Sequence, residues 1–274
     1  MPRRPADDHI FWRDPALPHL EAREVMDGRT VCYVPHSHAT FSIGAITGGH
    51  SEYLTGTDRY QAFAGTVVLM NPEIVHSCNP VNDQPWSYRM LYVDTGWLAT
   101  VQGQREFRPL AAVISRDAGL HADLMALFDL LFDMAVDAGE KDAGARAFFA
   151  GLAGRVEGAE LPPAADHGAL VRAADYITRY CTRDLRVEEV AAACGLSPSY
   201  LIRAFKARYG LTPHAYLTNQ RVRAGQAGLR QGQPIAEVAL DTGFADQAHF
   251  QRVFKAHVAA TPGQYAVSTS PPKA

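Results

Sequence analysis

The sequence predicts an α+β protein of two domains, in which a β-rich half precedes an all-helical half. Three observations support this: short apolar segments separated by turn residues, helical spacing from Leu120 onward, and a duplicated segment near the end. A chain of 274 residues is long enough for two domains of ordinary size. We expect the first domain over residues 1–156, a Pro-containing polar linker over 157–166 and the helical domain over 167–268.

The first half has the pattern of a small β-protein. Residues 53–60, 65–70 and 86–93 are short, apolar or alternating, and Gly, Pro, Asn and Asp separate them. Many short strands of this kind are typical of a sandwich or barrel. Apolar residues at helical spacing predict a helix over 120–134, and a second helix is expected over 147–156. The apolar stripe of these helices could pack on the chain's own barrel or meet a partner subunit.

Composition excludes several classes of protein. Apolar residues make up 47% and charged residues 20%, as in a globular protein. No apolar run reaches the roughly 18 residues that a membrane span needs. The first residues lack the apolar core of an export signal, so we expect a cytoplasmic protein without membrane contact. Four scattered cysteines without a Cys-x-x-Cys pair are expected to be reduced thiols.

Charge is distributed unevenly along the chain. From His167 onward there are 13 Lys and Arg against 7 Asp and Glu, a net charge of +6, and the preceding residues carry a net charge of −9. A polarised chain suits one half that meets a polyanion and another that does not. A basic helical half can also be an ordinary solvated surface, so charge alone leaves nucleic-acid binding open.

An internal repeat in the helical half is more informative. Residues 201–216 match residues 250–265 at a separation of 49, and Gly195 matches Gly243 at a separation of 48. The second copy therefore has one additional residue in its turn. The paired positions are Arg203 with Arg252, Phe205 with Phe254, Lys206 with Lys255, Thr212 with Thr261, Pro213 with Pro262, and Tyr216 with Tyr265.

Each copy has the parts of a helix-turn-helix unit. A short helix, over 187–194 or 235–242, ends at a Gly where a sharp reversal favours positive φ. The next helix begins after a capping residue, Ser197 in the first copy and Asp246 in the second. Apolar residues four apart then face the core of the unit. The repeat thus predicts two helix-turn-helix units in one domain.

The exposed faces of the second helices supply the candidates for reading DNA. N-terminal residues of such a helix reach base edges in the major groove. Arg bonds guanine bidentately and Gln bonds adenine, whereas Ile touches only a thymine methyl group. An exposed Arg can also contact phosphate or solvent alone. The candidates are Ser199, Ile202 and Arg203 in the first unit, and Gln247, Gln251 and Arg252 in the second.

These motifs resemble those of the AraC/XylS family of transcription regulators. The resemblance lies in GLSPSYLIRAFK (195–206), LTPHAYL (211–217) and TGFADQAHFQRVFK (242–255). It implies that a linking helix, here over 216–230, holds the two units so that they enter successive major-groove faces. The family usually has Gly after the second recognition helix and Arg after the final Tyr, where this chain has Ala259 and Ala266.

The first half resembles the cupin-like effector domain of many such regulators. His36 and His38 are two apart and would project to one side of a strand, and the loop after Asn71-Pro72 could bring His76 near them. Three imidazoles could bind Zn, Fe or Ni, but the acidic ligand of metal cupins is absent after His38. We therefore favour an effector pocket, or hydrogen bonds within the barrel, over a metal. The candidate effector contacts are His36, His38, Phe41, His76 and Arg89, the last for an acidic group.

The sequence thus favours a DNA-binding transcription regulator and not an enzyme. A small molecule is expected to change its binding to promoter DNA. No cofactor is expected, and the expected partners are double-stranded promoter DNA and the effector. RNA polymerase and a second copy of the chain are further partners that such a regulator could meet. The alternative is a metal-dependent cupin enzyme with an accessory helical domain, which rests on the three histidines only.

Overall fold

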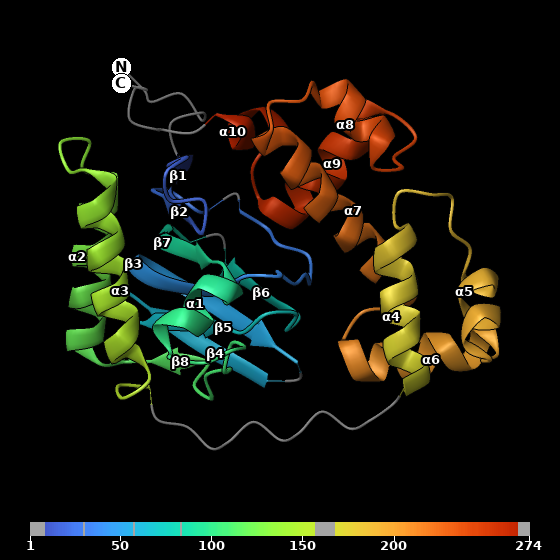
Figure 1. The fold of residues 1–274 in the computed structure, drawn as a ribbon, viewed down its shortest axis with the longest axis horizontal. Helices are drawn as coiled ribbons and strands as arrows, with labels where there is room; N and C mark the ends of the chain where they lie inside the picture. Colours follow the sequence, from blue (N-terminus) through green and yellow to red (C-terminus); the bar gives the residue numbers. More distant parts are fainter. Residues whose placement is uncertain (1–8, 30, 57, 83, 157–167, 268–274) are drawn as a thin grey trace.

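The computed structural model describes residues 9–29, 31–56, 58–82, 84–156 and 168–267 (Figure 1). The expected linker, residues 157–166, lies outside the described residues. The first domain contains an eight-stranded sheet whose described pairings are all antiparallel. Its strands are β1 (His9–Arg13), β2 (Leu20–Val25), β3 (Phe41–Thr55), β4 (Asp58–Phe63), β5 (Val67–Met70), β6 (His76–Pro80), β7 (Trp86–Val93) and β8 (Ile114–Ser115).

Strand β3 organises the sheet. Its first half pairs with β5 and β7, and its second half pairs with β4 and β6. The register with β7 shifts between Ile46 and Gly48, and such a bulge bends a strand. Gly49 follows with φ of 72°, where a Cβ would lie 2.0 Å from the Pro85 carbonyl oxygen. The expected cupin-like barrel is thus a bent sheet in which strand order runs openly from β1 to β8 within the described residues.

In the described part of this domain the sheet is joined by three helices, namely α1 (Thr95–Val101), α2 (Ala118–Phe132) and α3 (Ala138–Leu152). The apolar stripe of α2 packs on the chain's own sheet, with Leu124 and Phe128 fully buried. Alternate residues of β3 point to opposite faces of the sheet, as the strand period requires. Phe41 and Ile43 contact the core under α2 and α3, whereas Ile46 belongs to the core on the opposite face.

The second domain is helical, as predicted, and its two helix-turn-helix units share the long helix α7. The α2–α3 pair and this domain lie on opposite sides of the bent sheet (Figure 1). Helix α7 begins at Pro213, three residues before the expected start, because Thr212 caps it. The helices are α4 (Gly168–Tyr180), α5 (Val187–Cys194), α6 (Pro198–Tyr209), α7 (Pro213–Arg230), α8 (Ile235–Asp241), α9 (Gln247–Val258) and α10 (Pro262–Ala266).

A helix that could cross a membrane would have to be long and apolar. None of the helices in the described ranges meets both conditions.

Candidate DNA-binding surface and ligand site

The two recognition helices, α6 and α9, begin as the sequence predicts. The Ser197 hydroxyl accepts a hydrogen bond from the Tyr200 amide at 3.3 Å, and the Asp246 carboxylate accepts one from the His249 amide at 2.6 Å. The preceding glycines adopt left-handed conformations, with φ of 70° at Gly195 and 79° at Gly243. These side-chain caps fix where each recognition helix starts.

All six candidate reading residues lie at the surface. Leu201 and Phe205 of α6 are fully buried, as are Phe250 and Phe254 of α9, so each helix turns its opposite face to solvent. Within the described residues, neither Arg203 nor Arg252 forms an ion pair. The exposed positions are Ser199, Ile202, Arg203, Gln247, Gln251 and Arg252. Their contacts with DNA remain a prediction.

The C-terminal end of α9 rests on the first domain. Ala259 caps this helix with φ of 52°, in the conformation that Gly usually supplies. The fully buried Arg23 of β2 donates hydrogen bonds to the carbonyls of Val258 at 2.6 Å and Ala259 at 3.2 Å. The same guanidinium donates to the Tyr33 hydroxyl at 2.7 Å. A cation at the carbonyl end of a helix is favoured by the helix dipole.

A segment that we call the strap, residues 33–38, contacts the linking helix α7 and the second unit of the helical domain. The Val34 amide donates to the Ala256 carbonyl of α9 at 3.0 Å. The Asn219 amide group of α7 donates to the Ser37 carbonyl and hydroxyl, each at 3.2 Å. Asn219 is 2% exposed, so these bonds lie in a dry interface, where an unmade hydrogen bond would be costly.

Between the two domains lies a pocket of about 660 Å³. Arginines from both domains line it, two from the sheet and two from α7, and it also holds three carboxylates. Glu21 is already engaged, since it accepts a hydrogen bond from the Arg13 guanidinium at 2.8 Å. The charged groups are Arg13, Arg23, Arg223 and Arg230, with Asp14, Glu21 and Asp94.

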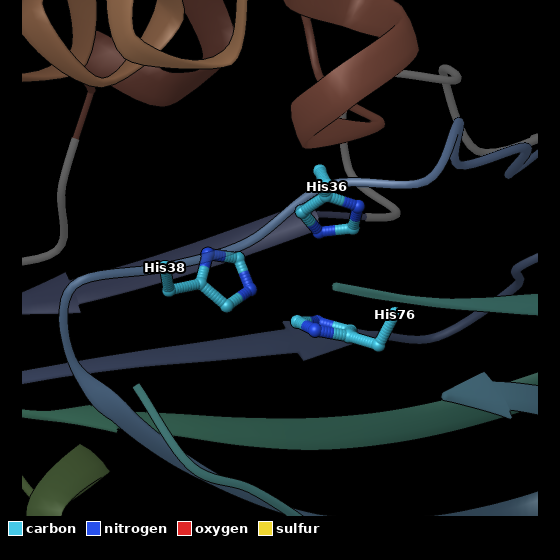
Figure 2. Close-up of side chains that lie close together, drawn as sticks. All are labelled: His36, His38 and His76. Atoms are coloured by element: carbon cyan, nitrogen blue, oxygen red, sulfur yellow. The ribbon is translucent and has the colours of Figure 1, made fainter. Parts of the chain in front are cut away.

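His36, His38 and His76 converge on one point, as Figure 2 shows. Their ring centroids are 4.7 to 4.9 Å apart, and one ligand nitrogen of each lies within 4.8 Å of the others. A pair of backbone hydrogen bonds joins His36 to His76, at 2.9 and 3.0 Å. His36 therefore lies in an extended segment with a single bridge and not in a regular strand, but the expected approach of His76 is observed.

The histidine rings are held neutral and oriented. Burial lowers the pKa of His76 to about 4, and burial with the neighbouring imidazoles lowers the pKa of His36 and His38 well below the ordinary value. Nδ1 of His36 bonds the Val34 carbonyl at 2.9 Å, and Nδ1 of His76 bonds the Ile74 carbonyl at 2.8 Å. A carbonyl only accepts, so each Nδ1 carries the proton and each Nε2 keeps a free lone pair.

The cavity beside these rings has a volume of only about 30 Å³. That is room for a water molecule or an ion, but not for an organic effector. His38 lines both this cavity and the interdomain pocket, whereas His36 and His76 line the small cavity alone. Of the three histidines, His38 is therefore the one that a ligand in the larger pocket could contact.

Two predicted effector contacts lie elsewhere. Phe41 is fully buried in the core beneath α2 and α3, because it alternates with the residues of β3 that face the cavity. Arg89 alternates with Tyr88 and Met90 on β7 and so faces away from the cavity. It forms ion pairs with Glu24 at 2.8 Å and Asp129 at 2.6 Å. The arginines that do line the pocket were missed, because no periodic pattern marks residues that meet only across domains.

Both halves of the chain are similar in sequence to known protein families. Residues 18–152 match the model of the AraC-like ligand binding domain, and residues 176–267 match that of a helix-turn-helix domain. SoxS of Salmonella typhimurium is 30% identical over 92 residues, which are 33% of this chain and 86% of SoxS. The chain belongs to the AraC family of transcription regulators. The family is one of regulators and not of enzymes, which removes the alternative of a cupin enzyme.

Other relatives match in part or in fold. The regulator MtrA of Neisseria gonorrhoeae is 36% identical over 80 residues, which are 29% of this chain and 27% of MtrA. The chain therefore matches about a quarter of that relative. The crystal structure of ToxT from Vibrio cholerae O395 aligns with a TM-score of 0.60 at 13% identity, over 90% of this chain and 97% of ToxT. This AraC-family regulator thus has the two-domain ToxT-like fold.

Proposed function

We propose that α6 and α9 enter neighbouring major-groove faces of one promoter site and read different sequences there. One observation carries the proposal: two copies of the same helix, each with an exposed Arg and an exposed N-terminal half, are held by the single helix α7. Arg203 and Arg252 suit guanine, and Gln247 and Gln251 suit adenine. We expect this activity in the cytoplasm, because promoter DNA lies there. RNA polymerase and a second copy of the chain remain further predicted partners.

The effector site of this proposal is the pocket between the domains. Its volume of about 660 Å³ is in the range of small-molecule sites, unlike the 30 Å³ cavity. Four guanidinium groups against three carboxylates favour an anionic ligand. The fold relative ToxT has been crystallised with an unsaturated fatty acid bound. We therefore infer an effector with a carboxylate and an apolar chain.

DNA binding is tested by a gel shift with DNA that flanks the chain's own coding region. Each base-reading Arg contributes about 1–3 kcal/mol, so Arg203→Ala with Arg252→Ala should weaken binding at least about 25-fold. The control removes two exposed charges from the first domain, Arg105→Ala with Arg116→Ala, and should bind almost as well as the wild type. No binding at low salt, or equal losses in both double variants, would refute the proposal.

The effector class is tested by thermal shift of the full chain with oleate and with its neutral analogue oleyl alcohol. A ligand that binds the native state raises the melting temperature, so oleate should do so and the alcohol should not. Arg223→Ala, which removes a pocket guanidinium paired with Glu73, should reduce the shift. Arg59→Ala removes a similar ion pair, with Glu52, outside the pocket and should leave it unchanged. Equal shifts with both ligands would contradict an anionic effector.

A further inference from the structure

The three histidines offer an unusual set of free lone pairs in a buried place. His36 is 5% exposed and His76 is 5% exposed, and in the described residues neither Nε2 has a hydrogen-bond partner. All three histidines line the small cavity, so a ligand that occupies it could accept these lone pairs. Because the backbone carbonyls hold both Nδ1 protons, the free lone pairs of His36 and His76 are the Nε2 ones.

This arrangement is the one that metal-binding histidines adopt. Such a histidine usually donates its second ring N–H to a carbonyl or carboxylate, which fixes the tautomer and orients the ring. Here the carbonyls of Val34 and Ile74, each two residues before its histidine, take that part. The adjoining cavity of about 30 Å³ is large enough for one ion.

We propose that His36, His38 and His76 bind one Zn²⁺-type transition-metal ion, and that the ion fixes the strap that holds the DNA-binding domain. Three neutral imidazoles suit Zn²⁺ and its neighbours, whereas Mg²⁺ and Ca²⁺ require oxygen ligands. The fourth position is left to water or to a donor atom of the effector, because His38 also lines the interdomain pocket.

The link to DNA binding follows from where the ligands lie. Two of them, His36 and His38, belong to the strap, and the third begins β6 in the sheet. The ligand nitrogens of the three histidines lie within 4.8 Å of one another, and one Zn²⁺ holds each of its nitrogen ligands about 2.0–2.1 Å away. One ion bound by all three histidines would therefore tie the strap to β6 of the sheet. The strap is hydrogen-bonded to Asn219 of α7 and to Ala256 of α9, so the linking helix and the second unit would respond.

The test of the site is a titration of chelator-treated full-length chain with Co²⁺, followed by its visible absorption, and with Zn²⁺ in competition. One equivalent should bind, and Mg²⁺ should not compete. His38→Ala and His38→Gln should weaken binding at least about 100-fold, since loss of a ligand should exceed the 10–100-fold effect of an outer partner. The His38 side chain makes no hydrogen bond in the described structure, and its backbone carbonyl, which accepts from the Glu73 amide at 2.8 Å, is kept in both variants. Both variants should therefore stay folded, as a thermal melt will verify.

His50→Ala is the matched control, because His50 lies in the same domain at the far half of β3 and stacks on Phe63. It should bind Co²⁺ like the wild type. Binding of much less than one equivalent by the wild type, or unchanged binding by His38→Ala, would overturn the metal site.

The link rests on the proposed DNA binding and is tested by gel shifts with Zn²⁺ or with chelator. We expect Zn²⁺ to change the affinity of the wild type at least about 5-fold, as in typical allosteric coupling, and to change that of His38→Ala much less. Unchanged affinity despite one bound equivalent would overturn the link. Metal uptake without any DNA binding would refute the proposed function and leave the metal site standing. DNA binding by a chain that takes up no metal would refute the metal site and leave the proposed function standing.

Discussion

The two helix-turn-helix units share a sequence pattern but end differently. Helix α6 ends at Gly210, with φ of 73°, where the nearest atom to an added Cβ is a Val75 side-chain carbon at 3.3 Å. Helix α9 ends at Ala259, and the buried Arg23 occupies its last carbonyls. The first unit therefore touches the ligand domain through an apolar loop, and the second is held by a buried cation. The two units are therefore similar in sequence but are attached to the ligand domain in different ways.

The largest effect on this contrast is expected from Arg23→Met. Methionine keeps much of the apolar stem but leaves the Val258 and Ala259 carbonyls without their donor. Hydrogen bonds from a charged group contribute about 1.5–3 kcal/mol each, so the free energy of unfolding should fall by about 3 kcal/mol or more. Chemical denaturation measures the loss, and hydrogen exchange should increase in α9 much more than in α6.

The control for this substitution is Arg59→Met, at an exposed ion pair with Glu52, which should change stability by less than about 1 kcal/mol. Equal increases of exchange in α6 and α9 after Arg23→Met would contradict the distinction between the units.

Exchanging the residues that cap the ends of α6 and α9, Gly210 and Ala259, tests the difference between the two units further. Gly210→Ala places a side chain in the left-handed region and against Val75, so we expect a loss of about 1–2 kcal/mol. Ala259→Gly relieves backbone strain at φ of 52° but gives up a buried methyl group, so the two effects should nearly cancel. Thermal melts of both variants check this. A loss at Ala259→Gly as large as at Gly210→Ala would show that the second unit depends on this methyl group.

A last effect, of about the same size as that of Gly210→Ala, concerns the stability of the protein in acid. His9 lies 2.8 Å from Arg23, and burial with the positive charges of Arg23 and Lys255 lowers the pKa of His9 to about 4. The folded state thus binds protons less readily than the unfolded state, whose pKa is about 6.5. This contribution is complete above pH 6.5 and is lost as pH falls toward 4. Between pH 7 and 5 we expect a loss of about 1–2 kcal/mol for a partly screened group.

Denaturation of wild type and His9→Gln at both pH values measures this effect. The variant keeps a hydrogen-bond acceptor but cannot be protonated in this range, so its stability should depend less on pH. Identical pH dependence of the two proteins would remove His9 from the account.

Local chemistry made the helical half predictable. The expected helix over 187–194 matches α5, and the caps Ser197 and Asp246 are confirmed, because caps and turn glycines act within a few residues. Helix α7 begins three residues before the expected start, at Thr212-Pro213, a pair that the sequence already shows as a signal for a helix start. Helix α3 begins at Ala138 and not near Ala147, because the Asp137 side chain accepts a hydrogen bond from the Glu140 amide and caps the helix there.

Long-range placement was not predictable in the same way. The approach of His76 to His36 was expected from the loop after Asn71-Pro72, whereas Phe41, a candidate effector contact, lies in the core under α2 and α3. The contact between Arg23 and Val258 joins residues 235 positions apart in the chain, and no periodicity marks it. The interdomain pocket is likewise formed by residues from both ends of the sequence, so its arginines became visible only in three dimensions.

The central claim is that two unequal units read one asymmetric DNA site. Selection of bound oligonucleotides by the intact chain from a random library tests this most directly. The account predicts two different half-sites about 10–10.5 base pairs apart, and predicts that Arg252→Ala relaxes one of them while Arg203→Ala relaxes the other. Identical half-sites, or relaxation of the same half-site by both variants, would contradict it.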